Sequence, residues 1–193
     1  MRKNYKQLLN TYISRISNPN MRNFIRFRSE QTHGLDSEKP IKHYSYFDVE
    51  AGINDEHLHF LMDPNLSKNV IIGFDMDYTL HQMGYFTNIL TKNFIDILSK
   101  LTKSKISYND IGEYYFGGKE RLKKMKDMFQ NLNKTIGMYN VYVITANPST
   151  LIKEIIPDLY SKLFNIKFKQ ENVKVTVPNK VTKYDIIKQI MNI

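Results

Sequence analysis

Apolar residues occur along the chain in two alternating patterns, as short continuous runs and as longer stretches with helical spacing. The run VIIGF at 70–74 predicts a strand buried on both faces of a parallel sheet, and further strands are predicted at 141–145 and 173–177. The stretches with helical spacing predict helices at 4–17, 53–62, 87–101, 119–133, 149–162 and 183–191. Strands that alternate with helices are typical of an α/β fold with a mainly parallel sheet.

Turn-forming residues separate these elements. Residues 18–40 hold Asn-Pro, His-Gly and Lys-Pro pairs, which predict a loop or linker, and residues 102–118 predict an irregular segment. The aromatic-rich run 41–47 ends at Asp48 and predicts one more strand. The pattern therefore divides the chain into a basic helix and linker at 1–40 and one α/β domain at 41–193.

The composition is that of a globular domain. Hydrophobic residues make up 41% of the 193 positions, which is enough for one core of ordinary size. No apolar run approaches the length of a membrane span, so none is expected. The absence of cysteine excludes disulfides, thiol catalysis and zinc–thiolate sites. It also fits an intracellular protein, for which the cytoplasm is the favoured location.

The positive charge is concentrated at the N-terminus. Residues 1–29 hold seven of the 28 basic residues and no acid, which leaves 21 basic against 19 acidic side chains in the rest of the chain. Three interpretations stay open for this arm: a solvated helix with a tail, an Arg-rich mitochondrial targeting segment, and an arm that contacts a polyanion.

The strongest chemical signal follows the run at 70–74. Asp75 and Asp77 stand directly after this strand, where the ligand sites of doubly wound sheets lie. Two carboxylates one residue apart suit phosphoryl transfer, since one can attack phosphorus and the other can protonate the leaving oxygen and then activate water. A hard divalent cation such as Mg²⁺ would offset the charge between carboxylate and phosphate.

The complete string, an apolar strand followed by Asp-Met-Asp-Tyr-Thr-Leu, resembles the first motif of the haloacid dehalogenase superfamily. The resemblance implies that Asp75 is the nucleophile and that Asp77 is the general acid and base, with Asp75 and the backbone carbonyl of Asp77 on the magnesium ion. Because the second acid is present, it also implies a phosphatase or phosphotransferase rather than a dehalogenase. The implied fold is a three-layer, Rossmann-like α/β/α domain.

Two further motifs of that superfamily have counterparts here. Its second motif is a Thr or Ser at the end of the next core strand, and VYVIT ends on Thr145, so Thr145 and the amide of Ala146 are expected to hold the phosphoryl group. Its third motif is a Lys at the start of a helix, which Lys183 fits best and Lys180 second best.

The fourth motif, which supplies further acids for the metal, has no counterpart after Lys183. The segment that ends in Asp48, Val49 and Glu50 resembles the missing strand and acidic turn, moved ahead of the first motif. We therefore expect a circularly permuted member in which Asp48 completes the magnesium site, with Glu50 or Asp55 assisting. The alternative is a peripheral strand unrelated to the metal.

The substrate is open at this stage. Few residues between Leu80 and Val141 are left for a cap domain, and a minimal cap leaves an open site that suits macromolecular or end-group phosphates. The candidate substrates are a phosphorylated nucleic-acid end, a small molecule such as a nucleotide or sugar phosphate, and a phosphoprotein. Tyr114, Tyr115 and Phe116 can stack on a base or belong to the core. The alternative function is an inactive subunit of this fold in a nucleoprotein or organellar assembly.

Overall fold

The computed structural model describes residues 5–33, 53, 55–82, 93–147, 151–178 and 180–192. Its helices are α1 (Tyr5–Ser14), α2 (Pro19–His33), α3 (Asp55–Leu61), α4 (Phe94–Thr102), α5 (Tyr108–Phe116), α6 (Lys119–Thr135), α7 (Ile152–Phe164) and α8 (Lys183–Met191). Its strands are β1 (Ile72–Asp75), β2 (Val141–Thr145) and β3 (Val173–Val175). Among these residues, no helix combines the length and the apolar character needed to cross a bilayer.

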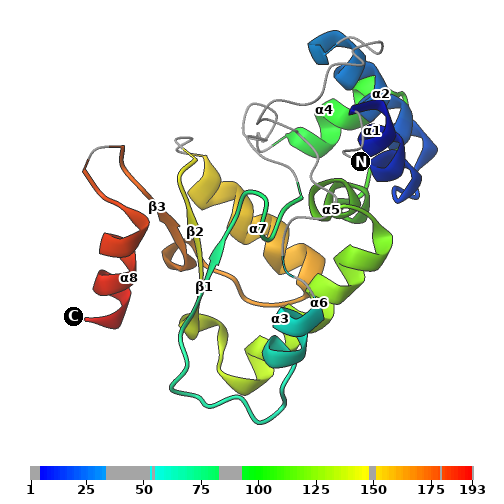
Figure 1. The fold of residues 1–193 in the computed structure, drawn as a ribbon. Coiled ribbons are helices and arrows are strands. Elements are labelled where there is room, and N and C mark those ends of the chain that lie inside the picture. The colour runs from blue at the N-terminus through cyan, green and yellow to red at the C-terminus, as the bar shows by residue number, and fades with distance from the viewer. Residues whose placement is uncertain are drawn as a thin grey trace.

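Over the described residues, the strands form one parallel sheet in the order β1-β2-β3. Helices connect consecutive strands, because parallel strands require a crossover connection: α4, α5 and α6 lie between β1 and β2, and α7 lies between β2 and β3. Figure 1 shows α6 and α7 on one side of the sheet and α8 on the other. The predicted α/β class with a mainly parallel sheet is therefore confirmed.

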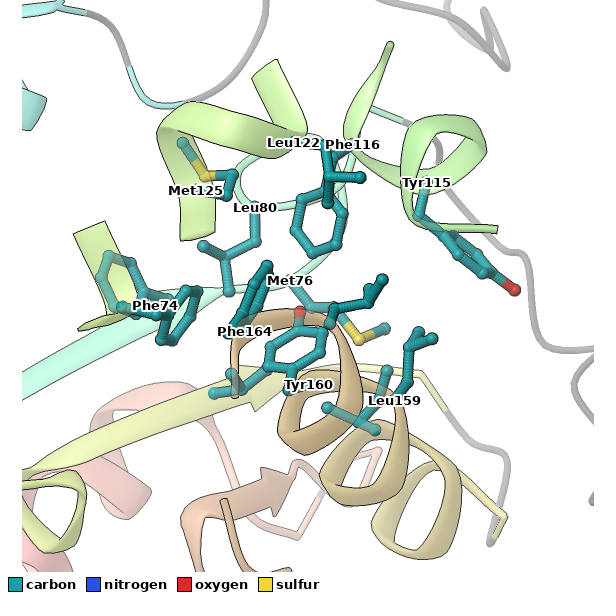
Figure 2. Close-up of a cluster of buried hydrophobic side chains, with 14 of the residues drawn as sticks. Phe74, Met76, Leu80, Tyr115, Phe116, Leu122, Met125, Leu159, Tyr160 and Phe164 are labelled. Carbon is teal, nitrogen blue, oxygen red and sulfur yellow. The ribbon is translucent and has the colours of Figure 1, made fainter. Parts of the chain in front are cut away.

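An aromatic core fills the space between the sheet and helices α5, α6 and α7 (Figure 2). The rings of Phe129 and Phe164 stack with centroids 4.7 Å apart. Tyr114, Tyr115 and Phe116 are all buried. Of the two interpretations of this aromatic run, the core is confirmed, and these rings do not offer a surface on which a base can stack.

Helices α1 and α2 belong to the same hydrophobic core as the sheet. Leu9, Tyr12 and Ile16 are buried near the first helix, and Met21 and Ile25 are buried in the second. Figure 1 shows both helices grouped with α4 and α5 at one end of the molecule. The part of the basic arm that the structure describes is therefore packed against the body through its apolar face.

Helix α2 lies where the sequence predicted a loop, so that prediction is wrong for residues 19–33. The Asn-Pro pair begins a helix here: Asn18 Oδ1 accepts hydrogen bonds from the amides of Asn20 and Met21. Pro19 occupies the first helical position, where its missing N–H costs nothing. The same pair of residues can therefore end one segment and start another.

Helix α5 lies where the sequence predicted an irregular segment, which is a second error. Ser107 and Asp110 form a reciprocal capping box at its start. Gly117 follows its last turn with φ 86°, the left-handed conformation that favours glycine. The signals for this helix were present in the sequence, although its apolar face is short.

The prediction that β1 is buried on both faces is also wrong. Ile72 and Phe74 are buried, whereas Ile71 and Gly73 are exposed. The reason is that β1 lies at the edge of the described sheet, while α8 on the opposite face packs against β2. The predicted strand 41–47 and the first residues of the predicted helices 87–101 and 149–162 lie outside the described residues.

Candidate active site

Four predicted site residues meet at the carboxyl ends of the strands. Asp75 ends β1, Thr145 ends β2, and Lys183 is the first residue of α8. The ammonium nitrogen of Lys183 lies 2.7 Å from Oδ2 of Asp75. The hydroxyl of Thr145 donates a hydrogen bond of 3.2 Å to Oδ2 of Asp77. Three separate elements therefore bring two carboxylates, one hydroxyl and one cation together.

A tight turn after β1 orients the two aspartates. The amide of Leu80 donates to the carbonyl of Asp75, and the amide of His81 donates to the carbonyl of Met76. Within this turn Tyr78 has φ 59°, a left-handed conformation that is rare for a bulky side chain. Such backbone strain costs of the order of 1 kcal/mol and is concentrated at functional sites. The rest of the turn must hold Tyr78 in this conformation.

Thr145 is held on both sides by hydrogen bonds. Its side chain is completely buried, and its hydroxyl accepts a hydrogen bond of 3.0 Å from the amide of Asn147 while donating to Asp77. Its carbonyl accepts from the amide of Thr176 after β3. Ala146, the next residue, is exposed at the same edge of the sheet. A fixed hydroxyl therefore stands beside an accessible backbone segment.

The turn before α8 places Lys183 over the sheet edge. Val177 and Val181 exchange two backbone hydrogen bonds, which reverses the chain after β3. Thr182 then caps the helix in a reciprocal pair with Asp185, and the hydrogen bonds from Thr182 hold the pKa of the Asp185 carboxyl below its usual range. Lys180 lies exposed in the turn. Of the two lysines considered, Lys183 is the one that contacts Asp75.

The site combines an open side with a buried side. The Asp75 and Lys183 side chains are 41% and 43% exposed, so a solute can reach them. Behind Asp77 lies a buried pair in which Tyr160 Oη is 2.8 Å from His81 Nε2. The pKa of His81 is lowered to about 3, mainly by burial and to a lesser extent by the nearby charge of Arg121, so this imidazole is neutral. The pKa of Tyr160 is raised, mainly by burial and to a lesser extent by the charge of Asp77.

Arg121 on α6 supports the turn, and the sequence analysis did not identify it. Its guanidinium donates 2.8 Å and 3.1 Å hydrogen bonds to the carbonyl oxygens of Thr79 and Ile53. The amide of Ile53 also donates to Thr79 O. A side chain that contacts backbone carbonyls does not require any sequence motif around it. The one weak signal for Arg121 in the sequence is that it is a single Arg beside the apolar face of a Lys-rich helix.

The predicted metal ligands are only partly described. Asp48 and Glu50 lie outside the described residues, and Asp55 forms an exposed ion pair with Lys124 at 2.7 Å. Over the ranges that the structure describes, no three acidic or histidine side chains gather as a metal site would require. The carboxylate of Asp75 and the backbone carbonyl of Asp77 nevertheless fit a magnesium ion, which is often bound by one or two carboxylates together with water and substrate oxygens.

Comparisons with protein-family models, with curated proteins and with solved structures found no match to this chain. A functional assignment therefore depends on the chemistry of the residues at the sheet edge.

Proposed function

We propose that the protein is a magnesium-dependent phosphatase of the haloacid dehalogenase type, which cleaves a phosphomonoester through an aspartyl-phosphate intermediate. One observation carries the proposal: the Lys183 ammonium is 2.7 Å from Asp75, and the Thr145 hydroxyl is 3.2 Å from Asp77. Residues from three positions far apart in the chain supply the nucleophile, the acid, the hydroxyl and the cation that this reaction needs.

In the first step, a carboxylate oxygen of Asp75 attacks phosphorus and the bond from phosphorus to the leaving oxygen breaks. Asp77 donates its proton to that oxygen, so that an alcohol leaves. In the second step Asp77 takes a proton from water, whose oxygen attacks the same phosphorus. The bond to Asp75 then breaks, which releases phosphate and restores the carboxylate.

Three groups would hold the phosphoryl oxygens during transfer. The Thr145 hydroxyl and the amide of Ala146 are hydrogen-bond donors at the end of β2, and Lys183 neutralises the negative charge that builds up beside Asp75. Because its one proton points to Asp77 in this structure, the Thr145 hydroxyl would turn from that carboxylate to a phosphoryl oxygen, while the amide of Asn147 continues to hold its oxygen in place.

Asp75 and Asp77 would hold the magnesium ion, with Asp48 as the third protein ligand. When bound, magnesium offsets the repulsion between the carboxylates and the phosphate. The contact between Ile53 and the carbonyl of Thr79 supports keeping Asp48 in the proposal, since it brings the chain that follows Asp48 to the turn that carries the aspartates. The circular permutation, the three-layer Rossmann-like fold and the minimal cap belong to the same proposal.

The test is hydrolysis of a generic aryl phosphate with and without magnesium, with the wild-type protein beside Asp75→Asn. We expect magnesium-dependent turnover that the substitution abolishes. That result would be followed by a substrate screen that includes nucleotides and oligonucleotides phosphorylated at the 3′ or 5′ end. Binding of beryllium fluoride, which stands in for the aspartyl phosphate, reports on the site without a substrate. Failure of both turnover and beryllium fluoride binding would favour the inactive-subunit alternative.

A further inference from the structure

A cavity lies away from the four residues of the candidate active site. It has a volume of about 590 Å³ and is bounded by the junction of α1 and α2, by α3 and by the start of α6. Five cationic side chains line it: Arg15, Arg22, Lys119, Arg121 and Lys124. This cavity is the place where the basic N-terminal arm meets the basic start of α6.

Of the described residues that line the cavity, fewer are acids than cations. The acids are Asp55 and Glu120, and Asp55 forms its ion pair with Lys124. A third acid, Glu113, is buried nearby and accepts a hydrogen bond from the amide of Ser17. Among the described lining residues, apart from the Asp55–Lys124 pair, four cations therefore face the cavity with one carboxylate, so this part of its wall carries a net positive charge.

Contacts with backbone carbonyls hold two of these cations, Arg22 and Arg121, in place without cancelling their charge. Arg22 Nη1 donates to the carbonyl of Ile16 at 3.0 Å, and Arg121 donates to two carbonyls. Burial lowers the pKa of Arg121. Tyr12 opposes this shift, and repulsion by the like charge of Arg15 adds to it. An anion between the two guanidinium groups would relieve that repulsion.

Arg15 is fixed against α6 by the backbone. The amide of Lys119 donates to the carbonyl of Arg15 at 3.2 Å. Gly118 has φ 112°, and a Cβ there would lie 2.6 Å from that carbonyl oxygen, so glycine permits the close approach. The cations from the arm and from α6 are therefore held beside one shared cavity and do not lie on independent surfaces.

We propose that this cavity binds a phosphate-bearing ligand of nucleotide size. The volume lies within the range of roughly 300–1,000 Å³ that is usual for small-molecule sites. Arg and Lys side chains are the usual partners of phosphate groups. Ile53, Leu58 and Met125 add apolar wall against which a base or another flat group can pack. The phosphate can belong to a free nucleotide or to a nucleic-acid strand.

The experiment is isothermal titration of the full chain, in EDTA, with three probes: pyrophosphate, adenosine diphosphate, and a short single-stranded oligonucleotide without terminal phosphates. We expect about one site per chain, with affinity weakened about tenfold or more by Arg15→Gln or Lys119→Gln. Both side chains are exposed, so the thermal unfolding midpoint of each variant should match that of the wild type.

Two control variants make the result specific. Lys126→Gln removes the same charge from an exposed position of α6 outside the cavity and should bind as the wild type does. Lys183→Gln should also bind normally, because Lys183 does not line the cavity; with EDTA present, this variant also minimises binding of the probes at the candidate active site. Tight binding of pyrophosphate or adenosine diphosphate would identify a free ligand, and binding of the oligonucleotide alone would identify a strand. The proposal is overturned if no probe binds, if Arg15→Gln and Lys119→Gln both bind normally, or if Lys183→Gln abolishes binding.

Discussion

The guanidinium group of Arg121 donates a 2.8 Å hydrogen bond to the carbonyl oxygen of Thr79, two residues after Asp77. Its other terminal nitrogen donates to the carbonyl of Ile53. The planar guanidinium group of an arginine can hold two carbonyl oxygens in fixed positions, which the ammonium group of a flexible lysine side chain does less well. Arg121 therefore joins α6 to the turn that carries both candidate catalytic carboxylates.

Arg121→Lys should lower kcat for aryl-phosphate hydrolysis about tenfold while KM changes little, since the change misplaces Asp77 and leaves the open face of the site intact. Steady-state kinetics measure both quantities. Lys123→Gln, an exposed position on the same helix, is the control and should behave as the wild type. An unchanged kcat in Arg121→Lys would show that the turn holds its shape without this contact.

Lys183→Gln should reduce kcat/KM by about 100-fold, because it removes the cation that neutralises charge at Asp75. The ion pair is more than a third exposed and is screened by solvent, so the thermal unfolding midpoint should hardly move. Lys180→Gln is the matched variant and should retain near-normal turnover. If Lys180→Gln lowered kcat/KM more than Lys183→Gln does, Lys180 would be the lysine that neutralises the charge at Asp75.

Thr145→Val should impair both activity and stability. The substitution keeps the shape of the side chain but removes the hydroxyl that donates to Asp77 and accepts from the buried amide of Asn147. Leaving that amide unpaired costs about 1–3 kcal/mol, which denaturant unfolding can measure. Thr145→Ser keeps the hydroxyl and should retain most of the activity. Equal loss of activity in both variants would mean that the methyl group, not the hydroxyl, matters.

Stability should fall in mild acid because of His81. Its pKa in the folded protein is about 3, against 6.5 in the unfolded chain, so the unfolded state binds more protons between these values. The contribution of His81 is therefore fully present above pH 6.5 and is lost as the pH falls toward 3, at about 1.4 kcal/mol per pH unit.

Urea unfolding at a series of pH values between 5 and 7 measures this effect, because most carboxylates are ionised throughout that range. His81→Gln is the control variant, since an amide can still meet the hydroxyl of Tyr160 but does not titrate. The variant should show a flatter pH dependence than the wild type. Parallel curves for the two proteins would mean that His81 is accessible to protons in the folded state.

Much of the sheet edge could be predicted because its residues sit at the ends of patterned elements. Asp75 and Thr145 each follow an apolar run, and parallel strands carry their carboxyl ends to one edge. Lys183 follows Thr182, which pairs with Asp185 in the sequence signature of a helix start. Local signals of this kind identify the element, and the parallel topology then brings the ends of the elements together.

The features that the sequence analysis missed depend on contacts between distant residues. Tyr160 reaches His81 across 79 positions, and Arg121 reaches Thr79 across 42. Neither contact follows from spacing along one helix or strand. Helix α2 was missed for a different reason, because Asn18 and Pro19 form a pair that can mark either a turn or a helix start.

The position of Lys183 in the last described helix also affects when the site can form during synthesis. Asp75 and Asp77 leave the ribosome before their cationic partner, which emerges only after β2, α7 and β3 have been made. A nascent chain can therefore build the sheet edge with both carboxylates while their charge is still uncompensated. If the proposed phosphatase activity is correct, it would reach its full rate only after α8 has emerged and docked, so the unfinished chain would act weakly on cellular phosphates.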